Sequence, residues 1–155
     1  MFTIVFIKKQ EILFRQCLNA YEKDDYQLSC LGLFSIADGI LGELSNQIGS
    51  TGWHKRLEAI QEKMLANKSL NQFERVNYLI ILYLQNYDNS VFCSCSFDCK
   101  EPDMLNRHWL VHGKTDRDYS KIDFLKVLLL IDAMIILYNS EKQKDNEGDG
   151  FDEQL

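Results

Sequence analysis

The sequence predicts an all-α protein, a single bundle of about five or six helices. Apolar residues recur at three- and four-residue spacing along most of the chain, and no series of alternating apolar and polar residues predicts strands. Only one proline occurs in 155 residues. With 46% apolar residues, a chain of this length can bury a sizeable core. We therefore expect one helical domain over residues 1–140.

Two helices are predicted in the first third of the chain. Asp24 and Asp25 are candidate caps between them. The first helix has an apolar stripe made of Ile12, Leu13, Cys17, Leu18 and Tyr21. The second carries Leu28, Leu31, Phe34, Ile36, Ile40 and Leu44.

A third and a fourth helix follow a turn marked by Gly49 and Gly52. The third is amphipathic, with Trp53, Leu57, Ile60 and Met64 on its apolar face. Ser69 and Gln72 have the spacing of a capping box ahead of a strongly apolar helix over residues 73–84. We expect this fourth helix to be central and residues 86–100 to form a loop.

The last third contains a short helix and a long one. Pro102 suits the first turn of the short helix, and Gly113 suits its C-terminal cap. After a polar linker over residues 114–119, Ser120 can cap a helix over residues 121–138. Its apolar run, residues 127–137, is too short to span a bilayer and predicts a core or subunit-interface helix. The acidic tail, residues 141–155, is expected to be disordered.

Charge, the N-terminal residues and cysteine content indicate the cellular compartment and the class of partner. The net charge of -6 does not favour a nucleic-acid coat protein. Residues 141–155, with six acids and two lysines, supply -4 of this charge. A locally basic groove in the rest of the chain is therefore still compatible with the net charge. The apolar opening precedes Lys8 and Lys9, the reverse of a secretory signal. Five cysteines, an odd number, favour reduced thiols. We expect a cytoplasmic protein without a membrane anchor.

Residues 106–113, Asn-Arg-His-Trp-Leu-Val-His-Gly, form the segment most suggestive of chemistry. Arg107, His108 and His112 lie within about two helical turns, between apolar neighbours on two adjoining faces. Such a helix is expected to be largely buried. Because unpartnered polar side chains cost several kcal/mol there, about 2–7 each, we expect them to be paired or to line a cleft for an anion.

These residues resemble a known family. Four residues separate Arg107 from His112, a polar residue directly follows the arginine, and Tyr119 stands ahead of a long apolar helix. This pattern resembles the HEPN superfamily (higher eukaryotes and prokaryotes nucleotide-binding) of prokaryotic toxin and defence systems. Residues 36–41, Ile-Ala-Asp-Gly-Ile-Leu, are similar to a family segment in which an acidic residue often stands where Asp38 stands. The resemblance covers residues 25–140.

The resemblance implies metal-independent cleavage of RNA, without a cofactor, at a site built from two protomers whose motif faces meet in a homodimer. His112 suits proton transfer and Arg107 suits the charged phosphate. His108 could orient His112 or the phosphate by a hydrogen bond, and Asp38, Asn106 and Tyr119 are possible supporting residues. Since Arg107 and His112 point about 140° apart around one helix, two copies are needed to aim both at one atom.

The resemblance also bears on regulation and substrate. Lys114 stands where family toxins silenced by a nucleotidyltransferase carry a tyrosine, so tyrosine-directed adenylylation is not expected. The chain lacks a basic, aromatic-interleaved segment for single-stranded RNA. An antitoxin or another partner protein is therefore a possible source of specificity.

Four other interpretations remain open. The domain could be a catalytically inactive helical dimer that binds a protein or a nucleotide. Asp38 could be a surface acid in a local salt bridge, and Tyr119 a packed aromatic in a turn. Cys93, Cys95 and Cys99, with one motif histidine, offer four zinc ligands, but without the Cys-x2-Cys pair of common zinc modules. Cys17 and Cys30 fit ordinary core positions.

Overall fold

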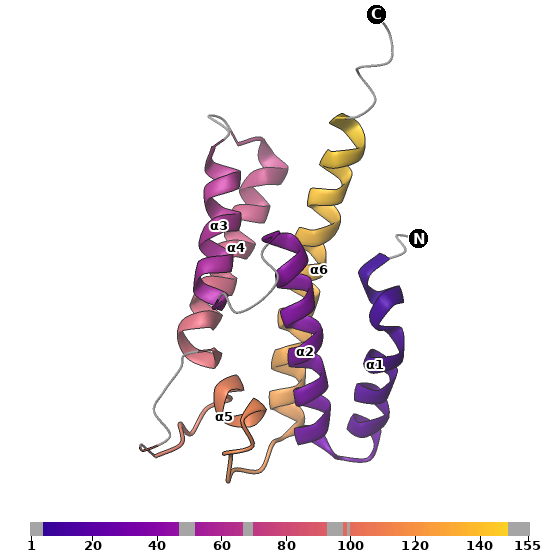
Figure 1. Cartoon of the computed structure of the whole chain (residues 1–155), viewed down its shortest axis with the longest axis vertical. Coiled ribbons are helices and arrows are strands. Elements are labelled where there is room, and N and C mark those ends of the chain that lie inside the picture. Colours follow the sequence, from indigo (N-terminus) through magenta and orange to yellow (C-terminus); the bar gives the residue numbers. More distant parts are fainter. Residues whose placement is uncertain (1–4, 47–51, 67–69, 93–97, 99, 149–155) are drawn as a thin grey trace, which may run out of the picture.

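The computed structural model describes residues 5–46, 52–66, 70–92, 98 and 100–148. These residues form six helices and no strand, as expected for an all-α protein (Figure 1). The helices are α1 (Val5–Glu22), α2 (Tyr26–Leu44), α3 (Trp53–Leu65), α4 (Gln72–Val91), α5 (Arg107–Val111) and α6 (Lys121–Gly148). The five long helices run roughly along the length of the molecule, and α5 lies at one end of the bundle (Figure 1).

Helix α2 is the centre of the bundle, and it contacts α1, α3, α5 and α6. The predicted cap is confirmed, because the Asp25 side chain accepts the Leu28 N–H at 3.2 Å. At Gly32 a Cβ atom would collide with the Cys17 sulfur, so glycine lets α1 approach closely. By length and apolarity α2 could also cross a membrane, yet over half of it is buried in the bundle. The prediction that the fourth helix is central is wrong.

Helices α3 and α4 form an antiparallel pair beside α2 (Figure 1). The capping box of α4 is formed by Asn71 and Glu74 rather than by Ser69 and Gln72, and Ser69 lies outside the described residues. The Asn71 side-chain oxygen accepts the Glu74 N–H at 2.9 Å, and the Glu74 carboxylate accepts the Asn71 N–H at 2.9 Å. The predicted cap position was therefore two residues too early.

Helix α4 also ends later than predicted, at Val91, so residues 86–91 are helical rather than part of a loop. The buried Asp88 lies 3.3 Å from His54 of α3, and Val91 is packed in the core. These tertiary contacts outweigh the turn preference of the polar residues there.

Helix α5 begins at Arg107, so Pro102 lies outside it and the predicted start is wrong. Asn106 is extended and accepts the Trp109 N–H at 3.2 Å, which makes it the N-cap. Gly113 ends the helix as predicted, with a φ of 63°. Its N–H donates to Leu110 and that of Lys114 to Trp109, the two hydrogen bonds of a Schellman cap.

Helix α6 begins as predicted, because Ser120 and Asp123 cap one another. It continues past the predicted end at residue 138 to Gly148. Glutamate, lysine and glutamine at positions 141–144 are good helix formers, which accounts for the extension. The remainder of the acidic tail, residues 149–155, lies outside the described residues.

Candidate functional site

The motif arginine is fixed against the central helix. The Arg107 Nη2 atom forms an ion pair and hydrogen bond with Oδ2 of Asp38 on α2. The other carboxylate oxygen of Asp38 accepts a hydrogen bond from the indole N–H of Trp53, the first residue of α3. Arg56 donates to the Asp38 backbone carbonyl at 3.4 Å. Asp38 thus connects α2, α3 and α5 at one point.

Arg107 remains only partly satisfied by these contacts. Its side chain is 25% exposed, and its Nε atom is buried with no hydrogen-bond partner among the described residues. Nη2 is engaged by Asp38, so Nη1 is the part of the guanidinium that remains for a second anion.

The two motif histidines contact each other one turn apart. The centroids of the His108 and His112 rings lie 4.5 Å apart at an interplanar angle of 65°, edge to face. Burial lowers the pKa of His108, and the charges of His112 and Arg107 lower it further. Its imidazole is therefore mainly neutral at neutral pH. His112, the C-cap residue, is exposed.

Burial of α5 is limited to one side, which corrects the expectation of a largely buried helix. Trp109 and Leu110 are packed in the bundle, whereas Val111 and the preceding Met104 are 39% and 54% exposed. A five-residue helix at the end of a bundle can cover only the side that faces α2. The histidines therefore lie at the edge of the bundle and can be reached from solvent.

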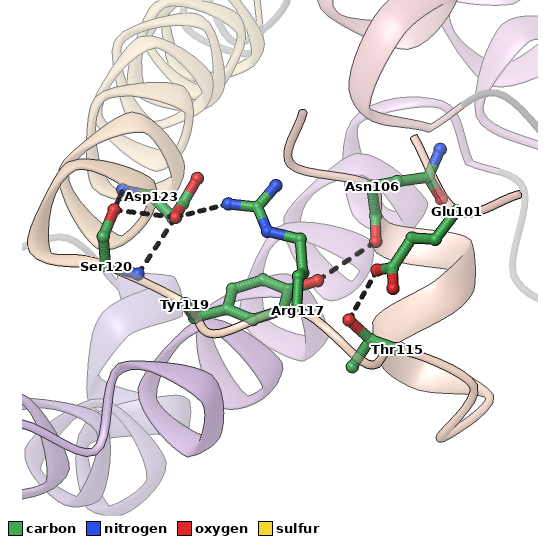
Figure 2. Close-up of polar contacts among 7 residues, drawn as sticks. All are labelled: Glu101, Asn106, Thr115, Arg117, Tyr119, Ser120 and Asp123. Carbon is green, nitrogen blue, oxygen red and sulfur yellow. Dashed lines mark hydrogen bonds and ion pairs between the residues drawn. The ribbon is translucent and has the colours of Figure 1, made fainter. Parts of the chain in front are cut away.

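Asn106 and Tyr119 support the motif helix structurally. Both are buried, and the Tyr119 hydroxyl donates to the Asn106 carbonyl at 3.4 Å (Figure 2). Burial raises the pKa of Tyr119 to about 12. Since the Asn106 side chain caps α5, neither polar group is directed to a substrate by these contacts. The interpretation of Tyr119 as a packed aromatic is confirmed, although residue 119 lies in irregular backbone rather than in a turn.

Three further hydrogen bonds fix the linker between α5 and α6. Glu101 accepts hydrogen bonds from the Thr115 hydroxyl at 2.5 Å and from the Asp116 N–H at 2.8 Å. Arg117 binds Asp123 at 2.7 Å, so the linker is held at both ends (Figure 2). Hydrogen bonds from Ser120 and Arg117 lower the pKa of Asp123 despite its burial. Gly113 and the residues after it are thereby placed against the motif helix.

An open cavity of about 730 Å³ lies beside Trp109 in this linker region. Its lining carries more negative than positive charge: Glu101, Asp103, Asp116 and Asp118 against Lys100 and Arg117. A phosphate backbone would be repelled there. The cavity is therefore a poor candidate for RNA, and the edge formed by Arg107 and the two histidines is the better one.

The cysteines divide into two groups. Cys17 and Cys30 are buried core residues, as predicted, and burial raises their pKa values to about 11 and 12. Cys93, Cys95 and Cys99, the candidate zinc ligands, lie outside the described residues. Among the residues that are described, no group of three or more potential metal ligands occurs.

Trp53 and Arg56 are site residues that the sequence did not suggest. Their spacing from Asp38, 15 and 18 residues, carries no local signal, because the contact depends on how α3 packs on α2. Trp53 is held by Phe92, whose ring stacks on it at a centroid distance of 3.5 Å.

The chain was compared with protein-family models, curated proteins and solved structures, and none of them matched.

Proposed function

We propose that this chain is a metal-independent endoribonuclease of the HEPN type, a toxin or defence effector that cuts RNA at a site shared by two copies. The observation that carries the proposal is that the polar side chains of the motif segment form two separate groups. Arg107 is oriented by Asp38 on one side, and the His108 and His112 rings lie together on another. The family resemblance of these same residues gives the reaction type.

The chemistry requires three functions. One group removes the proton of the 2′-hydroxyl, whose oxygen attacks the adjacent phosphorus. A second group protonates the departing 5′-oxygen, and a cation stabilises the added negative charge on the phosphorane. The products are a 2′,3′-cyclic phosphate and a free 5′-hydroxyl, so no redox step or metal is needed.

The residues fit these roles as follows. His112 is exposed, and an imidazole has one nitrogen that can accept a proton and one that can donate it, which suits proton transfer. The neutral His108 ring orients His112 through their contact. The Nη1 side of Arg107 binds the phosphate, since Asp38 holds Nη2. Arg107 and His112 of one chain point to different sides, so the second copy of the chain supplies the missing group through the motif face.

The experiment is cleavage of end-labelled RNA by the purified protein in excess chelator. We expect cleavage with cyclic phosphate ends, and a loss of about 100-fold or more in the variant His112→Ala. The matched control is His54→Gln, which changes the remaining histidine, 62% exposed on α3. Cleavage that requires a divalent ion, or that is unchanged in His112→Ala, contradicts the proposal. Absence of cleavage by the natural protein, together with binding of RNA or of a protein, would favour the inactive binding module instead.

A further inference from the structure

The two motif histidines lie one full helical turn apart at the edge of the bundle. The His112 N–H donates to the His108 carbonyl at 3.2 Å, so an α-helical hydrogen bond closes the turn between them. Their ring centroids are 4.5 Å apart. His108 is half-buried and His112 is exposed. The helix thus holds two imidazoles together at a place that ions in solution can reach.

Two imidazoles at this spacing can chelate a metal ion. Pairs of histidines separated by three residues recur in the zinc sites of helical segments. Imidazole nitrogens suit Zn²⁺, Cu²⁺ and Ni²⁺, and their bonds to zinc are about 2.0–2.1 Å long. When two imidazoles share one ion, each ring centroid lies about 3 Å from the ion, so the two centroids lie roughly 5 Å apart. The observed separation therefore agrees with chelation after a rotation of the rings.

The surrounding charge does not oppose a cation. Arg107 directly precedes His108, but its guanidinium is paired with Asp38 of α2, which offsets its charge. The cavity beside Trp109, the residue that follows His108, has four acidic and two basic residues in its lining. A surface of net negative charge raises the local concentration of cations. Divalent cations are thus attracted to this end of the bundle.

We propose that His108 and His112 chelate one divalent transition-metal ion, of the class of Zn²⁺, Ni²⁺ and Cu²⁺, and that this ion stops RNA cleavage. Water completes the coordination. Binding of the ion follows from the histidine geometry alone, whereas the inhibition rests on the proposed nuclease. A nitrogen bound to a metal has its lone pair engaged, so His112 cannot transfer a proton through it. The ion is therefore an inhibitor of the site and not a cofactor.

Calorimetric titration with Zn²⁺ tests the site without any use of the nuclease activity. Cys93, Cys95 and Cys99 are changed to serine in the full chain, so that no thiolate of this group binds the ion. We expect one ion per chain. Loss of even an outer-shell partner lowers metal affinity about 10–100-fold, so His108→Ala and His112→Ala should each raise the dissociation constant about tenfold or more. An unchanged dissociation constant in either variant overturns the proposal.

Two control variants separate chelation from the number of histidines. His112→Ala combined with Lys114→His has three histidines per chain, as the natural sequence does, but lacks the one-turn spacing, because Gly113 ends the helix before position 114. It should bind Zn²⁺ no better than His112→Ala alone. His54→Gln removes a histidine that lies between two carboxylates of α3 and α4, and it should bind Zn²⁺ as the natural histidine set does. Recovered binding in the first variant, or lost binding in the second, overturns the proposal.

The choice of ion provides a further test. Nitrogen ligands bind Cu²⁺ more tightly than Ni²⁺ or Zn²⁺, and we expect the same order here. Mg²⁺ prefers oxygen ligands and should neither bind nor inhibit at the same concentration. In the RNA assay, Zn²⁺ at the concentration that fills the site should lower cleavage about 100-fold or more, and excess chelator should restore it. Equal inhibition by Mg²⁺ would show that charge alone is responsible, and it overturns the site.

The results also separate the metal site from the nuclease. If the ion binds through both histidines and the protein cuts no RNA in chelator, the metal site is supported and the nuclease fails. If RNA is cut in chelator and no ion binds, the metal site alone fails. If RNA is cut at the full rate while the site is filled, inhibition by the ion is overturned, and so is proton transfer by His112.

Discussion

The Arg107 guanidinium binds the carboxylate of Asp38, a residue that lies 69 positions earlier in the chain. The contact joins the short motif helix to the centre of the bundle, and the Trp53 indole holds the same carboxylate from α3. Because a five-residue helix has little stability of its own, its orientation depends on such contacts. Asp38 is therefore a positioning residue for Arg107.

Replacement of Asp38 by asparagine should lower the turnover number of RNA cleavage. The variant Asp38→Asn keeps the shape of the side chain but removes the charge that directs Arg107, and a misplacement of about 1 Å can cost about 100-fold. RNA binding should be unchanged or stronger, because Arg107 is no longer neutralised. Single-turnover cleavage and a separate binding titration measure the two effects. The control is Asp103→Asn, which makes the same change at a side chain that is 93% exposed. An unchanged turnover number in Asp38→Asn would refute the positioning role.

Replacement of Trp53 by phenylalanine separates its hydrogen bond from its packing. Trp53→Phe keeps an aromatic ring against Phe92 but removes the N–H that binds Asp38. We expect a loss of about 1 kcal/mol in the free energy of unfolding, measured with urea, and a smaller loss of turnover than in Asp38→Asn. If Asp38 is already asparagine, Trp53→Phe should have much less effect on turnover. Additive losses in the double variant would exclude a common pathway.

The lowered pKa of His108 predicts how stability depends on pH. In the unfolded chain this histidine keeps its usual pKa of 6.5, and in the folded chain the pKa is lower. As pH falls through 6.5 toward the folded value, the unfolded state binds the proton more readily, so the native state loses stability in that window. His108→Gln cannot titrate and should lose less stability between about pH 7 and pH 5. Urea melts at both pH values measure the difference, and parallel losses in both proteins would contradict this assignment.

Local signals in the sequence predicted much of the fold. The Asp25 cap, the Gly113 stop and the Ser120 start were correct because each is decided by side chains within a few residues of the helix end. The amphipathic pattern of α3 likewise identified its buried face, including Leu57 and Ile60. Local signals did not decide every end correctly, because the cap of α4, the start of α5 and the end of α6 also depend on neighbouring residues and were predicted wrongly.

Two other differences, the end of α4 and the central position of α2, arise where distant contacts decide. The end of α4 is extended by the approach of Asp88 to His54, and α2 is central because it packs against four other helices. The contacts of the candidate site also depend on how distant helices pack. The motif residues stand next to one another in the sequence, whereas the contact of Trp53 with Asp38 exists only after α3 has packed on α2. Helix periodicity contains no information on that pairing.

Mixing two inactive variants tests the shared site most directly. Arg107→Ala retains His112, and His112→Ala retains Arg107, so a mixed dimer contains one complete pair across the motif face. After equimolar mixing and exchange of subunits, we expect cleavage of RNA in chelator at up to about a quarter of the natural rate, since half of the dimers are mixed and each has one of two pairs. The control mixture, Arg107→Ala with the variant that lacks both side chains, should stay inactive. If mixed dimers form, as native mass spectrometry can establish, and no cleavage returns, the shared site is contradicted.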